Sequence, residues 1–391
     1  MQAAATPLVV VGASARAFAA SAARIGLQVY AADLFADLDL RACVAAAVHV
    51  PDVPGGYPRG LVAAARTFPA GGFCYVGGLE NHPAIVEAIA RDRPLLGSPT
   101  AAVTTVRDPW SLRRLLHAAG LPVPECHRDP RGLPRDGSFL RKPLAGAGGR
   151  GIVVWDAAAP PTAAACLWQR RLTGEPWSAA YVVSSAGGEL LGMSRQLIGE
   201  AWCHARGFAY CGSLDVPLAG APGTLREQFL QLAPALAACG LRGVVGADAV
   251  VDAAGRAWVV EINPRPTASM ELVERATGRS IAASHLAACS DAPPPPAPAT
   301  PPARHWAKAV LFAPRPLVVD AKWLDRVAAW QRRWGDVSGH PALADIPPPG
   351  RSIPAGGPVC TLFAVADDAA ATVARLRQRA AVVFSPPGAA G

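Results

Sequence analysis

The segment 246–266, GADAVVDAAGRAWVVEINPRP, carries acidic and amide side chains suited to binding a metal ion. Apolar runs flank its DAAG stretch, and glycine supplies the positive φ that a tight turn needs, so the segment predicts a hairpin. A two-residue loop would place Glu261 opposite Gly246, with Asp248 and Asn263 on the same face, because strand side chains alternate. Hard cations such as Mg²⁺ take oxygen ligands and are commonly held by carboxylates together with substrate phosphates. The hairpin therefore predicts a magnesium site of Asp248, Glu261 and Asn263 beside a nucleoside triphosphate, the alternative being an acidic hairpin in solvent.

A second segment, 139–155 (FLRKPLAGAGGRGIVVW), joins two strand-like runs through a glycine-dense loop. Lys142 stands before the loop, whose glycines are Gly146, Gly148, Gly149 and Gly151. Backbone N–H groups of such a loop can approach phosphate oxygens closely, and a lysine adds a positive charge. The spacing differs from a Walker A loop, in which lysine follows the last glycine and precedes Ser or Thr. The segment predicts a flap over a triphosphate, with a merely flexible hairpin as the alternative.

Together these segments resemble the ATP-grasp superfamily of carboxylate–amine ligases over residues 100–288. Lys142, the glycine loop and the motif Glu261-Ile262-Asn263-Pro264-Arg265 match the family's elements in order and approximate spacing. The resemblance implies that Asp248 is the first metal carboxylate and that Arg265 holds the γ-phosphate or the substrate carboxylate. It also implies an adenine-binding hinge at 168–172, formed by groups of Gln169, Arg170 and Leu172. The implied cofactors are ATP and Mg²⁺, or Mn²⁺ in its place.

Two positions depart from the family pattern. A second lysine that contacts ATP is expected before residue 110, but the sequence there is Val106-Arg107-Asp108-Pro109. Either Arg107 contacts the phosphates or this contact is absent. The family's ribose-binding glutamate is expected just after the hinge, whereas Glu175 lies slightly early and is followed by Pro176. Arg107 and Glu175 are therefore further candidate ATP-binding residues.

The N-terminal stretch predicts a βαβ unit. An apolar run at 8–12 ends in Gly12, an alanine-rich helical stretch follows, and a second strand at 28–32 ends at Asp33. An acidic residue ~20 positions after the first glycine is part of the dinucleotide fingerprint, which offers a nicotinamide enzyme as a rival interpretation. Only the first of the three fingerprint glycines is present, so a Rossmann-like domain that binds no nucleotide, common in the ATP-grasp family, is favoured.

The expected fold class is α/β (α+β), an ATP-grasp fold with a Rossmann-like N-terminal domain and a small β-rich C-terminal lobe. The expected boundaries are 1–98 for the N-terminal domain, 99–290 for the ATP-grasp domain and 303–391 for the C-terminal lobe. Within the ATP-grasp domain, an ATP lid covers 139–178 and the metal-binding hairpin covers 244–266. The proline-rich stretch at 291–302 reads as a stiff linker that ends the catalytic core.

Composition argues against several classes of protein. The net charge is +8 over 391 residues, but the basic residues are dispersed, so nucleic acid is not an expected partner. No apolar run reaches the ~20 residues that span a bilayer, and the chain starts without a signal-like segment, so a cytoplasmic protein is expected. Nine cysteines occur without a CxxC pair, which favours neither a zinc site nor a disulfide framework.

The resemblance implies an ADP-forming ligase that makes a C–N bond. ATP would phosphorylate a substrate carboxylate, and an amine would attack the acylphosphate to form an amide. The expected partners are small-molecule carboxylate and amine substrates, together with a second copy in a homodimer. Lys142 and Arg265 are the expected catalytic cations, and Arg195 is expected on a strand facing the nucleotide, where it would grip an anionic substrate. A surface arginine is the alternative for Arg195, and Glu80 and Asn81 either touch substrate or cap a helix.

Three further interpretations stay open. The GGLEN segment and the C-terminal region resemble ligases of one-carbon cofactor biosynthesis, such as the tyramine–glutamate ligases of methanofuran-type pathways. A bicarbonate-activating carboxylase or carbamoyl-phosphate-type enzyme is an alternative activity, although the sequence shows no biotin-attachment Met-Lys-Met stretch. A nucleotide sensor without catalysis is the third.

Overall fold

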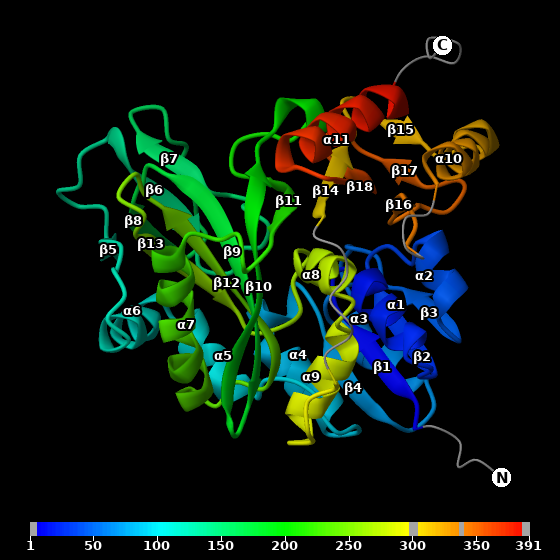
Figure 1. Ribbon diagram of the computed structural model, residues 1–391, viewed down its shortest axis with the longest axis horizontal. Coiled ribbons are helices and arrows are strands. Elements are labelled where there is room, and N and C mark those ends of the chain that lie inside the picture. The colour runs from blue at the N-terminus through cyan, green and yellow to red at the C-terminus, as the bar shows by residue number, and fades with distance from the viewer. Residues whose placement is uncertain (1–5, 297–303, 336–339, 385–391) are drawn as a thin grey trace.

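The protein is built of several sheets with helices packed around them, as a computed structural model describes for residues 6–296, 304–335 and 340–384 (Figure 1). These residues contain an eight-stranded sheet, two four-stranded sheets and a two-stranded pair. No helix in the same part of the chain is long and apolar enough to cross a membrane. The mixture of helices with parallel and antiparallel strands confirms the expected α/β (α+β) class.

The N-terminal sheet is parallel and has the order β3-β2-β1-β4. Its strands are β1 (Leu8–Val11), β2 (Val29–Asp33), β3 (Ala46–His49) and β4 (Gly72–Tyr75). Its helices are α1 (Arg16–Arg24), α2 (Leu38–Cys43), α3 (Gly60–Arg66), the 3-10 helix η1 (Leu79–Asn81) and α4 (Pro83–Ala90). Alternate residues of β1 pack in different clusters, Val10 with Phe18 and Val9 with Leu61. The sheet is thus buried on both faces, as parallel sheets are.

Asp33 uses its carboxylate inside the N-terminal domain. It is fully buried and accepts hydrogen bonds from the backbone N–H groups of Ala15 at 2.8 Å, Phe35 at 3.0 Å and Ala36 at 2.7 Å. These bonds hold the loops that follow β1 and β2 together. A carboxylate engaged in this way is not presented to a ribose, which argues against the nicotinamide interpretation.

A small antiparallel sheet forms the lid, and two helices precede it. The helices are α5 (Thr100–Arg107) and α6 (Pro109–Ala118). The lid strands are β5 (Cys126–His127), β6 (Asp136–Pro143), β7 (Val153–Asp156) and β8 (Cys166–Arg170), in the order β5-β8-β6-β7. The glycine-dense loop connects β6 to β7, so Lys142 lies near the end of a strand that directs the chain into this loop.

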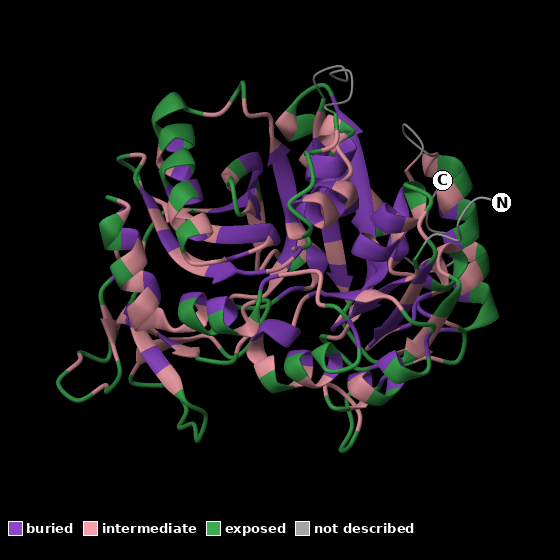
Figure 2. Ribbon diagram, turned by 90° about the horizontal axis from the view of Figure 1, so that it is seen from below, coloured by how far each residue is buried: buried purple, intermediate pink, exposed green. Residues whose placement is uncertain are grey.

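The eight-stranded sheet forms the centre of the protein, with the order β13-β12-β9-β10-β11-β14-β18-β16. Its first five strands in sequence are β9 (Glu175–Ser184), β10 (Gly187–Ile198), β11 (Tyr210–Val216), β12 (Gly243–Val251) and β13 (Ala257–Asn263). The associated helices are η2 (Ala201–Cys203), α7 (Gly223–Ala238), α8 (Met270–Thr277) and α9 (Ile281–Cys289). Phe229 and Leu232 of α7 pack with Tyr181 and Leu190 in one hydrophobic cluster. Figure 2 shows the strands of this sheet mostly buried, whereas the helices keep exposed outer faces.

The C-terminal segment extends the central sheet. Its elements are β14 (His305–Phe312), β15 (Leu317–Val318), α10 (Ala321–Trp334), β16 (Leu343–Ala344), β17 (Ser352–Ile353), β18 (Pro358–Ala366) and α11 (Ala369–Val383). Strand β14 pairs with β11 in antiparallel register, with Gly212 opposite Ala309. Backbone hydrogen bonds therefore join the predicted C-terminal lobe to the ATP-grasp core. Residues 297–302 of the predicted linker lie outside the described residues.

A buried ionic cluster connects these parts, with Glu271 of α8 at its centre. Glu271 accepts from Arg16 of α1 through both carboxylate oxygens, from Lys308 of β14 at 2.9 Å and from Arg275 at 3.3 Å. Arg16 also donates to Asp345 of the C-terminal segment at 2.9 Å. Burial opposes ionisation of Glu271, but Arg16, Lys308 and Arg275 together hold its pKa well below the ordinary value. The cluster therefore fastens the N-terminal domain, the ATP-grasp core and the C-terminal segment together.

Candidate active site

The hairpin of β12 and β13 brings Asp248, Glu261 and Asn263 together, in a register that differs from the prediction. Asp248 lies directly opposite Glu261, and Asn263 lies opposite Gly246. The predicted pairing of Glu261 with Gly246 is wrong for two reasons. The turn is longer than two residues, because Asp252 accepts hydrogen bonds from the backbone of Ala254 and Arg256, and an irregularity after Asp248 shifts the pairing again.

Asp248 is held by amide groups. Asn263 Nδ2 donates to its Oδ2 at 2.9 Å, and Gln196 Nε2 of β10 donates to its Oδ1 at 2.8 Å. Burial and the negative charge of Glu261 raise the pKa of Asp248 to about 6. The sequence placed Gln196 only in a segment expected to select the acceptor, because its contact with Asp248 depends on how β10 and β12 are both paired with β9 between them.

The donor set fits a hard divalent cation. Asp248 and Glu261 face each other across neighbouring strands, and their mutual repulsion is the kind that a bound cation relieves. Among the described residues no group of three or more His, Cys, Asp and Glu side chains is placed to hold a metal ion. A cation bound here would therefore rely on the two carboxylates, the Asn263 amide oxygen and oxygens of a bound phosphate, which is the usual arrangement for Mg²⁺.

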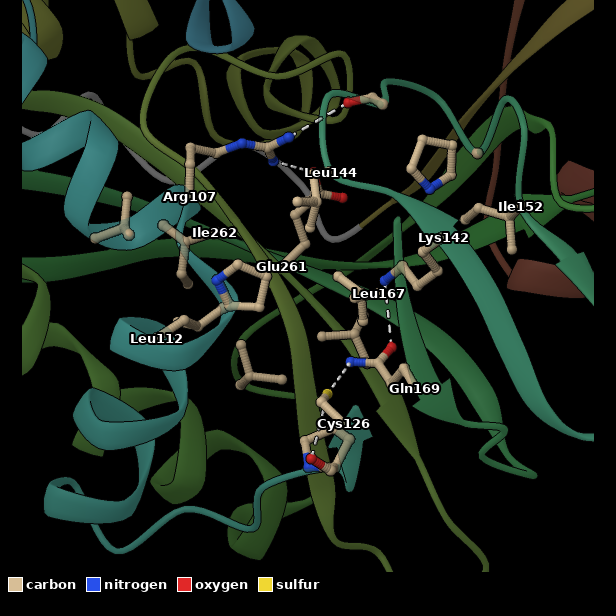
Figure 3. A pocket seen from close by; sticks show the side chains of 18 of the residues that line it. Arg107, Leu112, Cys126, Lys142, Leu144, Ile152, Leu167, Gln169, Glu261 and Ile262 are labelled. Carbon is tan, nitrogen blue, oxygen red and sulfur yellow. Dashed lines mark hydrogen bonds and ion pairs between the residues drawn. The ribbon is translucent and has the colours of Figure 1, made fainter. Parts of the chain in front are cut away.

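Two arginines border this acidic pair. Arg107, at the end of α5, forms an ion pair with Glu261 (Figure 3). It also donates to Asn81 Oδ1 at 2.9 Å. Arg265 donates to Glu80 at 2.6 Å and to Asn263 Oδ1 at 3.1 Å. Burial opposes ionisation of Glu80, but Arg265 keeps its pKa below the ordinary value. The Nε atoms of both arginines are buried without a hydrogen-bond partner among the described residues, which is the state expected of donors that await a ligand.

The predicted lid closes over a pocket next to this acidic pair. Gly146, Gly148, Gly149, Lys142, Arg107, Gln169 and Glu261 all line it. Lys142 Nζ donates to Gln169 Oε1 at 3.2 Å, and Figure 3 shows these side chains directed toward each other. Gly146 O accepts from Asn81 at 3.2 Å, and Tyr210 N donates to Gly148 O at 3.1 Å. The lid loop thus contacts both the N-terminal domain and the central sheet.

Glycine is required at one lid position for packing. Gly149 has φ +78°, and a Cβ built there would lie 1.8 Å from the carbonyl oxygen of Phe208. Any side chain would push the loop away from the backbone that precedes β11. Gly151 also has a positive φ and lies against Pro143, but it does not line the pocket. The loop therefore uses its glycines for close docking as well as for access to a ligand.

The structure does not bring all of the predicted residues to the pocket. Arg195 is exposed and donates to Glu175, also exposed, at 2.6 Å. Ser194, not Arg195, pairs with Ser178 in the row that contains Asp248, so alternation turns Arg195 to the opposite face of the sheet. The prediction that Arg195 faces the nucleotide is therefore corrected, and Glu175 lies away from the pocket with it.

Only part of the predicted adenine hinge lies at the pocket. Gln169 is buried and lines the pocket, whereas Arg170 and Leu172 do not. The backbone N–H of Arg170 donates to Glu125 O and that of Arg171 to Ser138 O, both at 2.8 Å. These amides complete the lid sheet instead of facing the pocket, so the hinge prediction is corrected at Arg170. Leu172 is not among the residues that line the pocket.

Comparison with known proteins agrees with this geometry. The protein-family model of the ATP-grasp domain matches residues 106–269. Carboxyaminoimidazole ribonucleotide synthase from Aspergillus clavatus, solved with ATP, is similar at TM-score 0.71 and 15% identity, covering 97% of this chain and 98% of that one. L-amino acid ligase from Bacillus licheniformis is similar at TM-score 0.69 and 14% identity, covering 96% and 97%.

A third solved structure is the biotin carboxylase domain of 2-oxoglutarate carboxylase from Hydrogenobacter thermophilus, in complex with MgADP and bicarbonate. It is similar at TM-score 0.67 and 14% identity, covering 95% of this chain and 89% of that one. No curated protein matches the chain. At these identities the similarity to solved structures shows a shared fold. The family match and the shared fold confirm the expectation from the sequence: the chain carries an ATP-grasp domain and has the fold of ATP-grasp enzymes.

Proposed function

We propose that the protein is an ATP-dependent ligase that joins a carboxylate to an amine and releases ADP and phosphate. The observation that carries this proposal is that Glu261, Lys142 and the lid glycines line one pocket. Asp248 lies opposite Glu261 on the hairpin, and Asn263 donates to Asp248. Acidic metal ligands, a lysine and a glycine loop together suit a triphosphate with Mg²⁺. The neighbours solved with ATP and with MgADP support the same ligands here.

Each residue then has a physical task. Phosphoryl transfer asks the protein for positioning and charge neutralisation. Mg²⁺ on Asp248, Glu261 and Asn263 would supply neutralisation of the β- and γ-phosphates. Lys142 and Arg107 place positive charge at the pocket wall, and Arg107 takes the position where the family's second lysine is missing. Arg265 orients the substrate carboxylate at the end of the pocket that borders Glu80.

The proposed reaction needs no side-chain nucleophile, because the two substrates supply both attacking atoms. A substrate carboxylate oxygen attacks the γ-phosphorus, and the bond to the β–γ bridging oxygen breaks with release of ADP. The amine then attacks the acyl carbon, the C–O bond to phosphate breaks, and the amine loses a proton. The protein holds the reactants in line and excludes water by means of the lid.

A cavity beside the pocket favours a substrate larger than bicarbonate. It has a volume of about 620 Å³ and includes Phe18, Phe312 and Ile353 in its lining. Bicarbonate alone would fill only a small part of this space, so at least one substrate is expected to be a larger molecule with an apolar part. A ligase for an organic acid and an amine, as in methanofuran-type cofactor biosynthesis, uses the space.

The test is ADP formation by the purified protein with Mg²⁺ and ATP against pooled amino acids, other carboxylates and amines. A ligase forms ADP only when the correct acid and amine are both present, with a product whose mass equals their sum less water. ADP formation with bicarbonate alone would favour the carboxylase activity. Tight ATP binding without turnover in any pool would favour the sensor.

Lys142→Ala is expected to weaken MgATP binding by about tenfold to 100-fold, since a charge-assisted hydrogen bond contributes ~1.5–3 kcal/mol. The dissociation constant can be measured by calorimetry. Lys322→Ala is the matched control, because Lys322 is an exposed lysine at the start of α10. An unchanged affinity in Lys142→Ala would remove Lys142 from the site.

Arg195→Ala is expected to leave ADP formation within about twofold of the parent protein. Its partner Glu175 is exposed, and exposed ion pairs contribute ~0–1 kcal/mol. Steady-state rates with the substrates found in the screen provide the measurement. A large rise in KM for the acid would return Arg195 to the substrate-binding role predicted from sequence.

A further inference from the structure

The 620 Å³ cavity adjoins the nucleotide pocket, because Gly148 and Arg150 of the lid loop line both. Its other walls come mainly from three parts of the chain. These are the N-terminal domain around the ends of its strands and the start of α1, the residues that follow β13, and the C-terminal segment with β14, β18 and residues 345–354. The volume is typical of a site for a small organic molecule.

The lining combines apolar side chains with charged ones. Phe18, Phe35, Val310, Phe312, Ile353 and Val359 supply apolar surface. Arg150 lines both this cavity and the nucleotide pocket, and Arg265 lines the cavity. Asp37 stands after β2, at another part of the wall.

Asp37 precedes helix α2, but its side chain does not cap the helix. At this N-cap position it accepts no capping hydrogen bond. By contrast, the N-cap residues Asp108, Asp320 and Asp368 each accept a hydrogen bond from the backbone of their own helix. Asp37 is 4% exposed, and no hydrogen bond or ion pair to its carboxylate is found within the described residues. Its carboxylate borders the cavity without a partner.

Near Asp37, acidic side chains outnumber basic ones. Asp345, Asp39 and Asp33 lie near it, and the nearby cation, Arg16, is already shared among Glu271, Asp345 and Asp39. Burial and then these three carboxylates raise the pKa of Asp37 to about 8. His49 and Arg351 also line the cavity, but they contact each other at 3.0 Å. A cationic group placed at Asp37 would relieve this excess of negative charge.

Resting on the proposed function, we propose that the cavity binds a substrate with an apolar body and a primary ammonium group, and that Asp37 binds the ammonium. Asp37 follows β2, whereas Arg265 lies beside Gly77 after β4, with β1 between these strands. Two strand spacings correspond to roughly 10 Å. The ammonium at Asp37 is therefore an anchoring group, and the substrate's reacting group lies at the opposite end, toward Arg265 and the lid.

The test is calorimetric titration of 2-phenylethylamine into the full-length protein at pH 7, without ATP. 2-Phenylethanol has a similar shape but no charge and serves as the matched probe. Asp37→Asn keeps the shape of the side chain and removes a buried negative charge, so the variant is expected to fold. Asp52→Asn is the control, because Asp52 also lines the cavity but is exposed.

The amine is expected to bind the parent protein and Asp52→Asn alike, and to bind Asp37→Asn about tenfold to 100-fold more weakly. The pKa of Asp37 is raised in the free protein, and a bound ammonium favours the carboxylate, so binding should also release protons. The heats in Tris and phosphate buffers should therefore differ for the parent protein and agree for Asp37→Asn.

Equal amine affinity in the parent protein and Asp37→Asn would overturn the proposal. So would binding of the alcohol as tight as that of the amine, no binding of the amine to the parent protein, or an equal loss in Asp52→Asn, which would indicate a general effect of negative charge. None of these results affects MgATP binding or substrate-stimulated ADP formation, so the proposed function would stand on its own test.

Discussion

Glu261→Gln is expected to lower MgATP turnover by about 1,000-fold, the largest effect on activity that we predict. Glu261 faces Asp248 across the hairpin and lines the pocket together with Lys142. Its replacement removes one of two carboxylates and can turn an N–H donor toward the metal. Metal neutralisation contributes several kcal/mol to phosphoryl transfer, and ~4 kcal/mol corresponds to about three powers of ten. Initial rates of ADP formation over a Mg²⁺ titration provide the measurement.

The matched control is Glu227→Gln, since Glu227 is an exposed glutamate of α7, far from the lining of the pocket. It should keep the parent rate and the parent Mg²⁺ dependence. If Glu261→Gln retained more than a tenth of the parent rate at low Mg²⁺, Glu261 would not be a metal ligand. The Arg107–Glu261 ion pair would then be a structural contact.

Glu271→Gln is expected to lower the free energy of unfolding by about 3–5 kcal/mol, the largest predicted effect on stability. Glu271 is the common partner of Arg16, Lys308 and Arg275. Loss of its charge leaves these buried cations with fewer partners, and breaking a buried ionic group in this way is strongly destabilising. Urea denaturation at pH 7 measures the change, with Glu227→Gln as the exposed control. A loss below 1 kcal/mol would show that the cluster is not needed to join the three parts.

The same cluster predicts how this difference depends on pH. The pKa of Glu271 is held well below its ordinary value, so its ionised form stabilises the folded protein. That contribution is complete above the pKa of an unfolded glutamate, ~4.3, and is lost as the pH falls toward the folded value. Glu271→Gln should therefore differ most from the parent protein at neutral pH and approach it in acid. A difference independent of pH would assign the effect to packing.

Much of the nucleotide site could be predicted from local sequence. Asp248, Glu261 and Asn263 lie on one hairpin, and Lys142 stands beside its own glycine loop, so their proximity depends on few residues of chain. The exact pairing could not be predicted in the same way. It depends on Asp252, which closes a longer turn through its side chain, and on an irregularity inside the strand.

Errors occurred where a residue's orientation depended on distant partners. Arg195 lies on a strand next to the site, but the register of β10 against β9 turns it outward, where it pairs with Glu175. Gln196, its neighbour, contacts Asp248 for the same reason. Arg170 was predicted to bind adenine through its backbone, but its N–H donates to Glu125 O in the lid sheet instead. A shift of one residue moves a strand side chain to the other face, so such positions need the register.

The sequence by itself determined the class of fold and the chemistry of the candidate nucleotide site, because strand alternation, glycine loops and closely spaced ligands are local properties. The tertiary structure alone decided how α1, α8 and β14 meet at Glu271 and how Asp37 comes to line a cavity with Arg265. These residues are far apart along the chain, and their contacts arise from the packing of domains against the central sheet. Contacts between distant residues leave no periodic pattern in the sequence. The burial of Asp37 and the acidic residues around it could therefore be identified only in the folded protein.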